Sequence, residues 1–435
     1  MHTVNELIPW LIYGVPAAVA LVIYLRNYRA RTQVHEELLL ESVAANLTEP
    51  PSLHPVVDLG RCIGSGACVK ACPEGALGVL DGKAVLVGAA HCIGHGACFP
   101  ACPVEAIKLV FGTEKRGIDI PVVKPNFESN VPGIFIAGEL GGMGLIRKCA
   151  EQGRQAINAA RAAMKGNAEF DVVIVGAGPA GIAAGLASIE HKLKYKLIEQ
   201  EDSLGGAVYH YPRNKIAMTA PVNLPVIGKV KFTEVSKEQL LEFWNGVMKK
   251  TGLQVSFRER MEAIERSGDG FVVQTQRGKY HAKTVLLAIG RRGTPRKLGA
   301  PGEDSPKVVY RLIDPEQYKG QRVLVVGGGD SALEAAVAVS EQPGSKVTIS
   351  YRSEAFSRVK EKNRSALKQA QDAGRLRVML KSSISQIETD KVHLKYEEKD
   401  VAIRNDIVIV CAGGELPTPL LKKIGVMFET HRGEV

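Results

Sequence analysis

The sequence predicts an α/β protein in which two parallel-sheet domains follow a small α+β domain and an N-terminal helix. From about Phe170 onward, short apolar segments alternate with helical ones, which is the pattern of a parallel sheet. Two of the apolar segments run into glycine-rich turns, and six of the eight cysteines fall in two runs of identical spacing between Cys62 and Cys102. At 435 residues the chain is too long for one core, so several domains are expected.

Composition and charge narrow the classes of function. The chain is 45% hydrophobic and 23% charged, with a formal net charge of +10, which is the balance of a folded globular protein. We find no nucleic-acid module and no stripe of alternating basic and aromatic residues. We therefore expect no nucleic-acid partner and assign the charge to dinucleotide phosphates, a membrane surface or an acidic redox partner.

The N-terminal segment predicts a membrane anchor. Residues 7–25 carry no charged side chain, and this matches the roughly 20 residues that cross a hydrocarbon core. Arg26, Arg29 and Arg31 follow, which places the remaining chain in the cytoplasm by the positive-inside rule. A cleaved signal peptide is disfavoured because no basic residues precede the run; a buried helix is the other alternative. The expected location is the inner (cytoplasmic) membrane, with a single transmembrane helix and cytoplasmic domains.

The cysteine runs form an internal repeat. CIGSGACVKACPEGAL starts at Cys62 and returns as CIGHGACFPACPVEAI at Cys92. This resembles the bacterial two-cluster ferredoxins, in which the cysteine before the proline ligates the other cluster. The resemblance implies two iron–sulfur clusters, one held by Cys62, Cys68 and Cys102 and the other by Cys92, Cys98 and Cys72.

The repeat departs from the ferredoxin pattern at one position in each half, where Ser65 and His95 replace a cysteine. Each cluster is therefore either a 3Fe-4S centre with three thiolates or a 4Fe-4S centre with Ser65, His95 or water on the fourth iron. The alternative is that both are only loop residues. A ligating imidazole should raise the reduction potential, as in Rieske centres. Structural zinc fits less well, because zinc sites favour closely spaced cysteine pairs.

The first glycine turn has the form of a dinucleotide-binding unit. An apolar strand from Asp171 leads into Gly176, Gly178 and Gly181 and then into a helix. These glycines allow a tight turn, close approach of a pyrophosphate and close packing of helix on strand. Glu199 ends the next strand, where a ribose-binding carboxylate belongs.

A second unit of the same form starts at Arg322, with Gly327, Gly329 and Ala332 in its turn. No acidic residue ends its second strand; Arg352 and Arg358 follow instead. Arginines at this place favour NADP over NAD, because they pair with a 2′-phosphate. The alternative is that both arginines are simply solvated.

Together these motifs resemble the flavoprotein family with two dinucleotide-binding domains that contains the thioredoxin reductases. LLAIGRRGTP near residue 290 and VIVCAGGELPTP near residue 411 belong to the same resemblance, and GGAVYHYP at Gly205 is closer to the bacillithiol-disulfide-reductase-like branch. The resemblance implies Rossmann-like domains, FAD in the first site, NADP (or NAD) in the second, and a homodimer. No cysteine lies between Cys149 and Cys411, so dithiol chemistry of the thioredoxin reductase type is not expected. Both cysteines are interpreted as structural; the alternative for Cys149, which lies in the flavin-contacting segment, is a flavin-linked thiol.

The order of one segment differs from the family. The family closes with a stretch like VPGIFIAGEL, which contacts the flavin, and here that stretch lies upstream at Val131. We interpret this as a circular permutation, with Gly138 and Glu139 at the flavin-contacting positions. The predicted domains are residues 1–28 (anchor), 29–58 (juxtamembrane helix and linker), 59–112 (ferredoxin-like), 116–168 (permuted segment), 169–300 (FAD), 301–410 (NAD(P)) and 411–435 (return to the FAD domain).

The function expected from these features is relay of electrons between nicotinamide, FAD and two iron–sulfur clusters. The one-electron partner would be a quinone, a cytochrome or a ferredoxin-type protein, and the direction of flow is open. One alternative is a flavin-dependent reductase of a small disulfide or organic substrate. The other is a non-enzymatic redox sensor, which is disfavoured because no output domain is visible.

Overall fold

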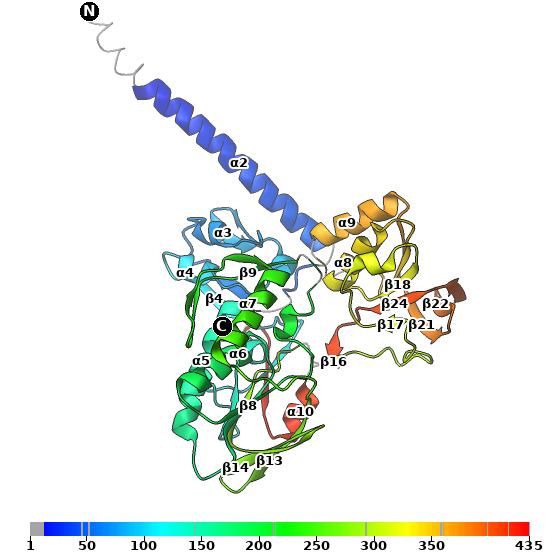
Figure 1. Ribbon diagram of the computed structural model, residues 1–435. Coiled ribbons are helices and arrows are strands. Elements are labelled where there is room, and N and C mark those ends of the chain that lie inside the picture. Colours follow the sequence, from blue (N-terminus) through cyan, green and yellow to red (C-terminus); the bar gives the residue numbers. More distant parts are fainter. Residues whose placement is uncertain are drawn as a thin grey trace, which may run out of the picture. The chain divides into compact units, whose positions relative to one another are not determined.

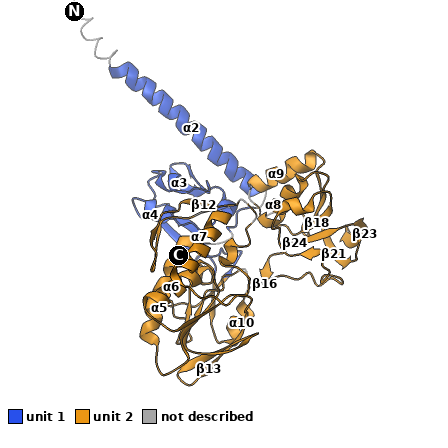
Figure 2. Cartoon of the chain, viewed as in Figure 1, with its two compact units in different colours: residues 1–118, 431–435 blue, residues 119–430 orange. Residues whose placement is uncertain are grey.

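The computed structural model of the chain describes residues 13–44, 47–50, 53–142, 144–211, 213, 215–291, 294–356, 359, 361–397, 399–415 and 417–434. The chain divides into two compact units (Figure 2). Unit 1 comprises residues 1–118 and 431–435, and unit 2 comprises residues 119–430. Helices and strands carry the labels of Figure 1.

Unit 1 begins with helix α2 (Val15–Ala44), a single long helix (Figure 1). Its C-terminal part is fixed to the cysteine-rich domain. The Ser42 hydroxyl donates a hydrogen bond to the Val87 carbonyl oxygen at 2.9 Å, and His35 Nδ1 accepts one from the Val79 amide at 3.2 Å. A Cβ at Gly78 would lie 2.8 Å from the His35 ring, so the glycine permits this close approach.

The prediction of a single-pass anchor in the inner membrane is wrong. In the part of the chain that the structure describes, no helix is both long and apolar enough to cross a membrane. In the described part of α2, the apolar residues Val15–Leu25 are followed directly by Arg26, Arg29 and Arg31, so no stretch of membrane-spanning length is apolar throughout. Residues 7–12 of the predicted span lie outside the described residues.

The cysteine-rich domain is built from two antiparallel strand pairs and short helical turns. Strand β1 (His54–Val57) pairs with β4 (Ile107–Val110), and β2 (Leu77–Leu80) pairs with β3 (Lys83–Leu86). The turns are η2 (Ala89–His91) and the short helices α3 (Ala67–Ala71) and α4 (Cys98–Ala101). Leu77, Ile107 and four of the thiols share one small core. This is a small α+β domain, as the repeat predicts.

The first sheet of unit 2 surrounds strand β7. Its order is β13–β14–β15–β7–β8, and β6 pairs with β15. Strands β6, β15, β7 and β8 run parallel, whereas β13, β14 and β15 form an antiparallel meander. The bounds are β6 (Ile134–Ile136), β7 (Phe170–Val175), β8 (Tyr195–Ile198), β13 (Met261–Ser267), β14 (Gly270–Thr275) and β15 (Gly278–Leu287). The parallel strands are buried, which explains their continuous apolar runs.

The second sheet of unit 2 is parallel throughout, in the order β17–β24–β18–β19–β20. An antiparallel meander, β21–β22–β23, lies between β20 and β24 in the chain. The bounds are β17 (Val308–Val309), β18 (Arg322–Val326), β19 (Lys346–Ser350), β20 (Leu376–Met379), β21 (Ser382–Ile387), β22 (Lys391–Tyr396), β23 (Lys399–Arg404) and β24 (Ile407–Val410). The two parallel sheets confirm the mixed α/β class.

Helices and short strand pairs complete unit 2. The described helices are η3 (Gly138–Gly141), α5 (Ile146–Ala163), α6 (Pro179–Glu190), η4 (Gly206–Val208), α7 (Lys237–Thr251), η5 (Pro315–Tyr318), α8 (Asp330–Ser340), α9 (Glu361–Asp372) and α10 (Thr418–Lys423). The short antiparallel pairs are β9 (Ile216–Met218) with β12 (Glu234–Ser236), β10 (Val222–Leu224) with β11 (Gly228–Val230), and β16 (Thr294–Pro295) with β25 (Gly414–Glu415). Strands β5 (Ile118–Pro121) and β26 (Phe428–His431) pair where the chain passes from one unit to the other.

Candidate functional site

The first candidate site is the glycine turn that follows β7. Gly176 has a left-handed φ of 102°, and a Cβ there would lie 2.6 Å from the Ala288 carbonyl oxygen. A Cβ on Gly181 would lie 1.7 Å from the Gly176 carbonyl oxygen. Helix α6 begins at Pro179, directly after Gly178, so its free amide groups face the turn. The turn therefore admits a pyrophosphate close to the backbone.

Glu199 lies at this turn, at the end of β8. Its carboxylate accepts hydrogen bonds from the Ala177 amide at 2.6 Å and from the Glu201 amide at 3.0 Å, and the residue is only 6% exposed. Burial raises the pKa of Glu199, and the two amide hydrogen bonds oppose that shift. The structure thus brings the acidic residue and the glycines of the first motif together.

The upstream segment that contains Gly138 and Glu139 packs against the same turn. The Gly138 amide donates to Gln152 Oε1 at 2.9 Å, and a Cβ on Gly138 would lie 3.1 Å from Ala180 Cβ. Helix α5 approaches α6 so closely that a Cβ on Gly153 would lie 2.0 Å from the Ala180 carbonyl oxygen. Gly138 therefore sits beside the first turn of α6.

Glu139 faces the loop after β15. A Cβ added at Gly290 would lie 3.7 Å from Glu139 Oε2. Burial lowers the pKa of the neighbouring Arg291 guanidinium, although the charges of Glu139 and Asp119 act in the opposite direction. Glu139 thus carries a carboxylate next to a half-buried cation at the edge of the first site.

The second glycine turn follows β18 and leads into α8. Gly327 has a φ of 144°, and a Cβ there would lie 2.3 Å from the Cys411 carbonyl oxygen and 3.2 Å from Ala332 Cβ. A Cβ on Gly329 would meet nothing within 4 Å, which leaves space beside the N-terminus of α8. The Tyr351 ring packs against Gly328, where a Cβ would come within 2.3 Å of it. This turn therefore repeats the geometry of the first.

The structure describes one of the two arginines proposed for a 2′-phosphate. Arg352 is exposed and lies two residues after β19, at the carboxyl end of that strand. Glu354, two residues later, pairs with Lys381 at 2.7 Å. Arg358 lies outside the described residues.

The six clustered thiols line two separate pockets in unit 1. Pocket 1 is lined by Cys62, Cys68, Cys102 and Ser65, with apolar neighbours. Pocket 2 is lined by Cys72, Cys92, Cys98 and His95, with Glu74 among its neighbours. Each pocket takes its last cysteine from the other half of the repeat.

The loops around both pockets depend on glycines with left-handed backbone. Gly64 and Gly66 have φ of 68° and 69°, and Gly94 and Gly96 have φ of 76° and 74°. A Cβ on Gly64 would come within 2.1 Å of the Gly82 carbonyl oxygen. These values let each loop curl around its pocket.

Burial raises the pKa of three of the pocket thiols. It raises the pKa of Cys98 to about 11 and also raises the pKa values of Cys68 and Cys92. For Cys92, the negative charge of Glu74 adds to this effect. Iron binding deprotonates coordinating thiols outright, so these values describe the protein without metal.

The donor set of each pocket fits an iron–sulfur cluster. Each pocket offers three cysteine sulfurs, and a multi-iron cluster distributes its thiolates over several irons.

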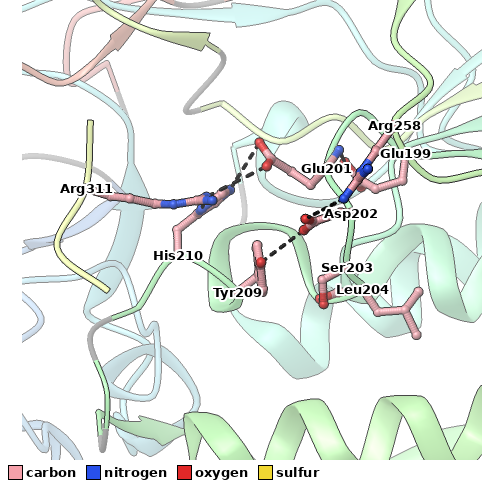
Figure 3. A network of polar contacts seen from close by, with 9 residues as sticks. All are labelled: Glu199, Glu201, Asp202, Ser203, Leu204, Tyr209, His210, Arg258 and Arg311. Atoms are coloured by element: carbon pink, nitrogen blue, oxygen red, sulfur yellow. Dashed lines mark hydrogen bonds and ion pairs between the residues drawn. The ribbon is translucent and has the colours of Figure 1, made fainter. Parts of the chain in front are cut away.

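A polar network that the sequence did not predict lies in unit 2 (Figure 3). Arg311 contacts His210 and is 3.7 Å from the Glu201 carboxylate, and His210 Nε2 is 3.6 Å from Glu201. Beside it, the Tyr209 hydroxyl donates to Asp202 at 3.0 Å. The only signal in the sequence was the GGAVYHYP stretch, which contains Tyr209 and His210; nothing pointed to Arg311, which lies about a hundred residues away.

The comparisons with known proteins agree with this geometry. Residues 173–434 match the pyridine nucleotide-disulphide oxidoreductase family, and residues 54–103 match a 4Fe-4S dicluster domain. The ferredoxin–NADP reductase of Thermus thermophilus is 32% identical over 61% of this chain and 79% of its own length. That of Ignicoccus hospitalis is 34% identical over 43% of this chain, and the chain spans only 57% of it.

A solved structure shows the same fold. The bacillithiol disulfide reductase Bdr of Staphylococcus aureus superposes with a TM-score of 0.51, at 22% identity, over 60% of this chain and 81% of its own. The predictions of an NAD(P)H-dependent flavin oxidoreductase, with FAD, NAD(P) and iron–sulfur clusters as cofactors, are confirmed. The chain belongs to the pyridine nucleotide-disulphide oxidoreductase family and carries a 4Fe-4S dicluster domain in the same polypeptide.

Proposed function

We propose that this chain transfers electrons between NADP(H) and a ferredoxin-type, one-electron partner, with two iron–sulfur clusters of its own between them. The observation that carries this proposal is the union in one chain of a flavoprotein similar to ferredoxin–NADP reductases and a domain with two cysteine-lined pockets. A tether keeps such a domain at high effective concentration near the flavoprotein.

The residues that would hold FAD surround the first glycine turn. The α6 N-terminus and the glycines at 176, 178 and 181 would bind the pyrophosphate, and Glu199 would bind the ribose. Gly138 and Glu139 would contact the flavin itself. Bound FAD supplies the conversion between two-electron and one-electron transfer.

For the clusters, we propose the ligand sets that the repeat implies. The supporting observation is that the thiols divide between the pockets in those sets of three. Ser65 and His95 line the pockets at the fourth position, and both are exposed. Ser65 Oγ also accepts a weak hydrogen bond from the Ala67 amide at 3.5 Å, a local role that competes with ligation. His95 is therefore the stronger candidate for a fourth ligand.

We also propose that the flavoprotein part is circularly permuted. Support comes from residues upstream of the first glycine turn, which supply strand β6 to the same sheet and helix α5 against α6. Such rearrangement is physically feasible because the termini of domains lie at surfaces and often close together.

The experiment that tests the function is an anaerobic titration of the full chain, reconstituted with FAD, iron and sulfide. NADPH and NADH are added in separate runs while visible spectra follow the flavin and EPR follows the clusters. We expect NADPH to bleach the flavin at lower concentration than NADH, because Arg352 can pair with the 2′-phosphate. Cluster signals should then appear, with a shape that identifies three-iron or four-iron centres.

Two results would contradict the proposal. If the flavin is reduced but the clusters stay oxidised with excess NADPH, forward transfer is wrong. Addition of a reduced ferredoxin then tests the reverse direction, in which electrons from the clusters produce NADPH. Failure in both directions would exclude the clusters from the reaction.

A further inference from the structure

The two cysteine-lined pockets come from equivalent halves of a repeat, so their surroundings can be compared position by position. Residues thirty positions apart are equivalent, as Cys62 and Cys92 are. By this correspondence, Glu74 of the first half is equivalent to Val104 of the second, and Lys83 is equivalent to Leu53. At each of these two positions, one half of the repeat therefore has a charged side chain and the other half an uncharged one.

A cation and backbone amide donors lie next to the cysteines of pocket 1. The Lys83 ammonium donates to the carbonyl oxygen of Cys62 at 2.7 Å. Two backbone amides also point at its sulfurs, Ala84 N to Cys62 Sγ at 3.4 Å and Ala106 N to Cys102 Sγ at 3.2 Å. Backbone amides also hydrogen-bond to the sulfurs of Cys92 and Cys98 in pocket 2, so Lys83 and not the amides distinguishes pocket 1. Val104 lines this pocket with an apolar side chain.

Pocket 2 has a carboxylate and a carbonyl oxygen at the corresponding places, and the histidines at 54 and 95 also line it. Glu74, the counterpart of Val104, lines the pocket, and its carboxylate acts electrostatically on the Cys92 sulfur. The Leu53 carbonyl oxygen lies 3.7 Å from Cys92 Sγ. Once that thiol becomes a thiolate, the carbonyl dipole opposes its charge.

A cluster gains negative charge when it is reduced, so nearby cations and amide donors raise its reduction potential and carboxylates lower it. We propose that Lys83 and Glu74 separate the potentials of the two clusters, with the cluster of pocket 1 the higher. This inference rests on the proposed function, because it requires a cluster in each pocket. An electron that enters the domain then settles in pocket 1.

The histidine that replaces a cysteine in pocket 2 would shift the potential in the opposite direction to Glu74. A ligating His95 would raise the potential of pocket 2 and offset part of the difference. The test therefore changes only Lys83 and Glu74 and leaves every candidate ligand in place. Each residue is replaced by its counterpart in the other half, Lys83→Leu and Glu74→Val, which an equivalent pocket already accommodates.

The measurement is an anaerobic redox titration of the full reconstituted chain, with EPR at low temperature and with iron and sulfide contents for every variant. We expect Lys83→Leu to move one midpoint to more negative potential and Glu74→Val to move the other to more positive potential. The double variant should bring the two midpoints closer together. Lys83→Arg and Glu74→Asp retain the charges and should stay near the wild-type values.

The inference is overturned if either neutral variant leaves both midpoints in place at unchanged iron content, or if the double variant widens their separation. If Lys83→Leu loses iron, Val104→Glu repeats the test in pocket 1 and should lower the midpoint that Glu74→Val leaves unchanged; no shift overturns the inference. Wild-type protein with iron and sulfide for fewer than two clusters would instead contradict the proposed function.

Discussion

At the scale of single residues, the clearest ion pair in the second dinucleotide domain joins Arg322 and Asp406. The Asp406 carboxylate accepts from the Arg322 amide at 2.8 Å, from its Nε at 2.9 Å and from its Nη2 at 2.5 Å. These hydrogen bonds lower the pKa of Asp406 to about 2 against the opposing effect of burial. The pair therefore fixes the start of β18 next to β24.

We predict that Asp406→Asn lowers the free energy of unfolding at pH 7 by about 1 kcal/mol, a modest value because both side chains are more than a third exposed. The folded-state pKa of Asp406 is depressed, so its contribution is present above the ordinary carboxyl pKa of 3.8 and is lost as pH falls toward 2. Urea unfolding of both proteins at pH 7 and at lower pH measures this. Asp304→Asn, whose pair with Lys297 is exposed, should change little. A difference between wild type and Asp406→Asn that does not depend on pH would refute the assignment.

At the scale of elements, the contact between α5 and α6 shapes the first dinucleotide site. Glycine at position 153 lets the backbone of α5 come into direct contact with the backbone of α6. The amino end of α6 faces the glycine turn. Because protein interiors are close-packed, a single added methyl group here must move one helix. The turn would move with it.

Gly153→Ala should therefore destabilise the protein by about 3 kcal/mol and reduce the FAD retained per chain, since its Cβ would lie 2.0 Å from the Ala180 carbonyl oxygen. Flavin absorbance after gel filtration and the thermal unfolding midpoint measure the two effects. The matched control is Gly246→Ala in α7, where a Cβ meets nothing within 4 Å. The free energy of unfolding of this control variant should rise by roughly 0.5–1 kcal/mol, since alanine is the better helix former. Equal behaviour of the two variants would exclude the packing argument.

At the scale of the whole molecule, the strands of the first sheet of unit 2 follow a different order along the chain than in the sheet. Strand β6 precedes β7 in the chain but pairs with β15, whose register joins Val285 to Ile134 and Val173. Residues before the first glycine turn are thus part of the sheet that carries it. A permuted flavoprotein requires this arrangement.

The proposed permutation predicts how truncated chains behave. Residues 116–435 should retain FAD and be reduced by NADPH, whereas residues 169–435 should lose FAD because β6, α5 and Gly138 are missing. Flavin content and anaerobic bleaching by NADPH distinguish the two chains, and circular dichroism verifies that both fold. If the shorter chain binds FAD as well as the longer one, the upstream segment is not part of the flavin site.

Much of the candidate site was predictable because its motifs are local. The spacing of the glycines within six residues restricts the backbone directly, so the two turns follow from the sequence, whereas the two thiol sets follow from the resemblance of the repeat to two-cluster ferredoxins. The membrane anchor was predicted from the uncharged run and the arginines after it. The prediction was wrong because, in the described part of α2, the apolar residues up to Leu25 are followed at once by Arg26, Arg29 and Arg31, and no stretch is long and apolar enough to cross a membrane.

The sequence by itself determined the α/β class and the cofactors, because their motifs lie close together in the chain; the division of the thiols was implied by the resemblance to two-cluster ferredoxins, and it joins cysteines tens of residues apart. Only the tertiary structure decided where β6 pairs, how closely α5 approaches α6, and that Arg311 meets His210 and Glu201. These depend on contacts between residues tens to hundreds of positions apart, which packing selects and local spacing does not encode. The charge difference between the pockets depends on both. The two halves of the repeat differ at Lys83 and Glu74 in the sequence, and the fold places these side chains beside their cysteines.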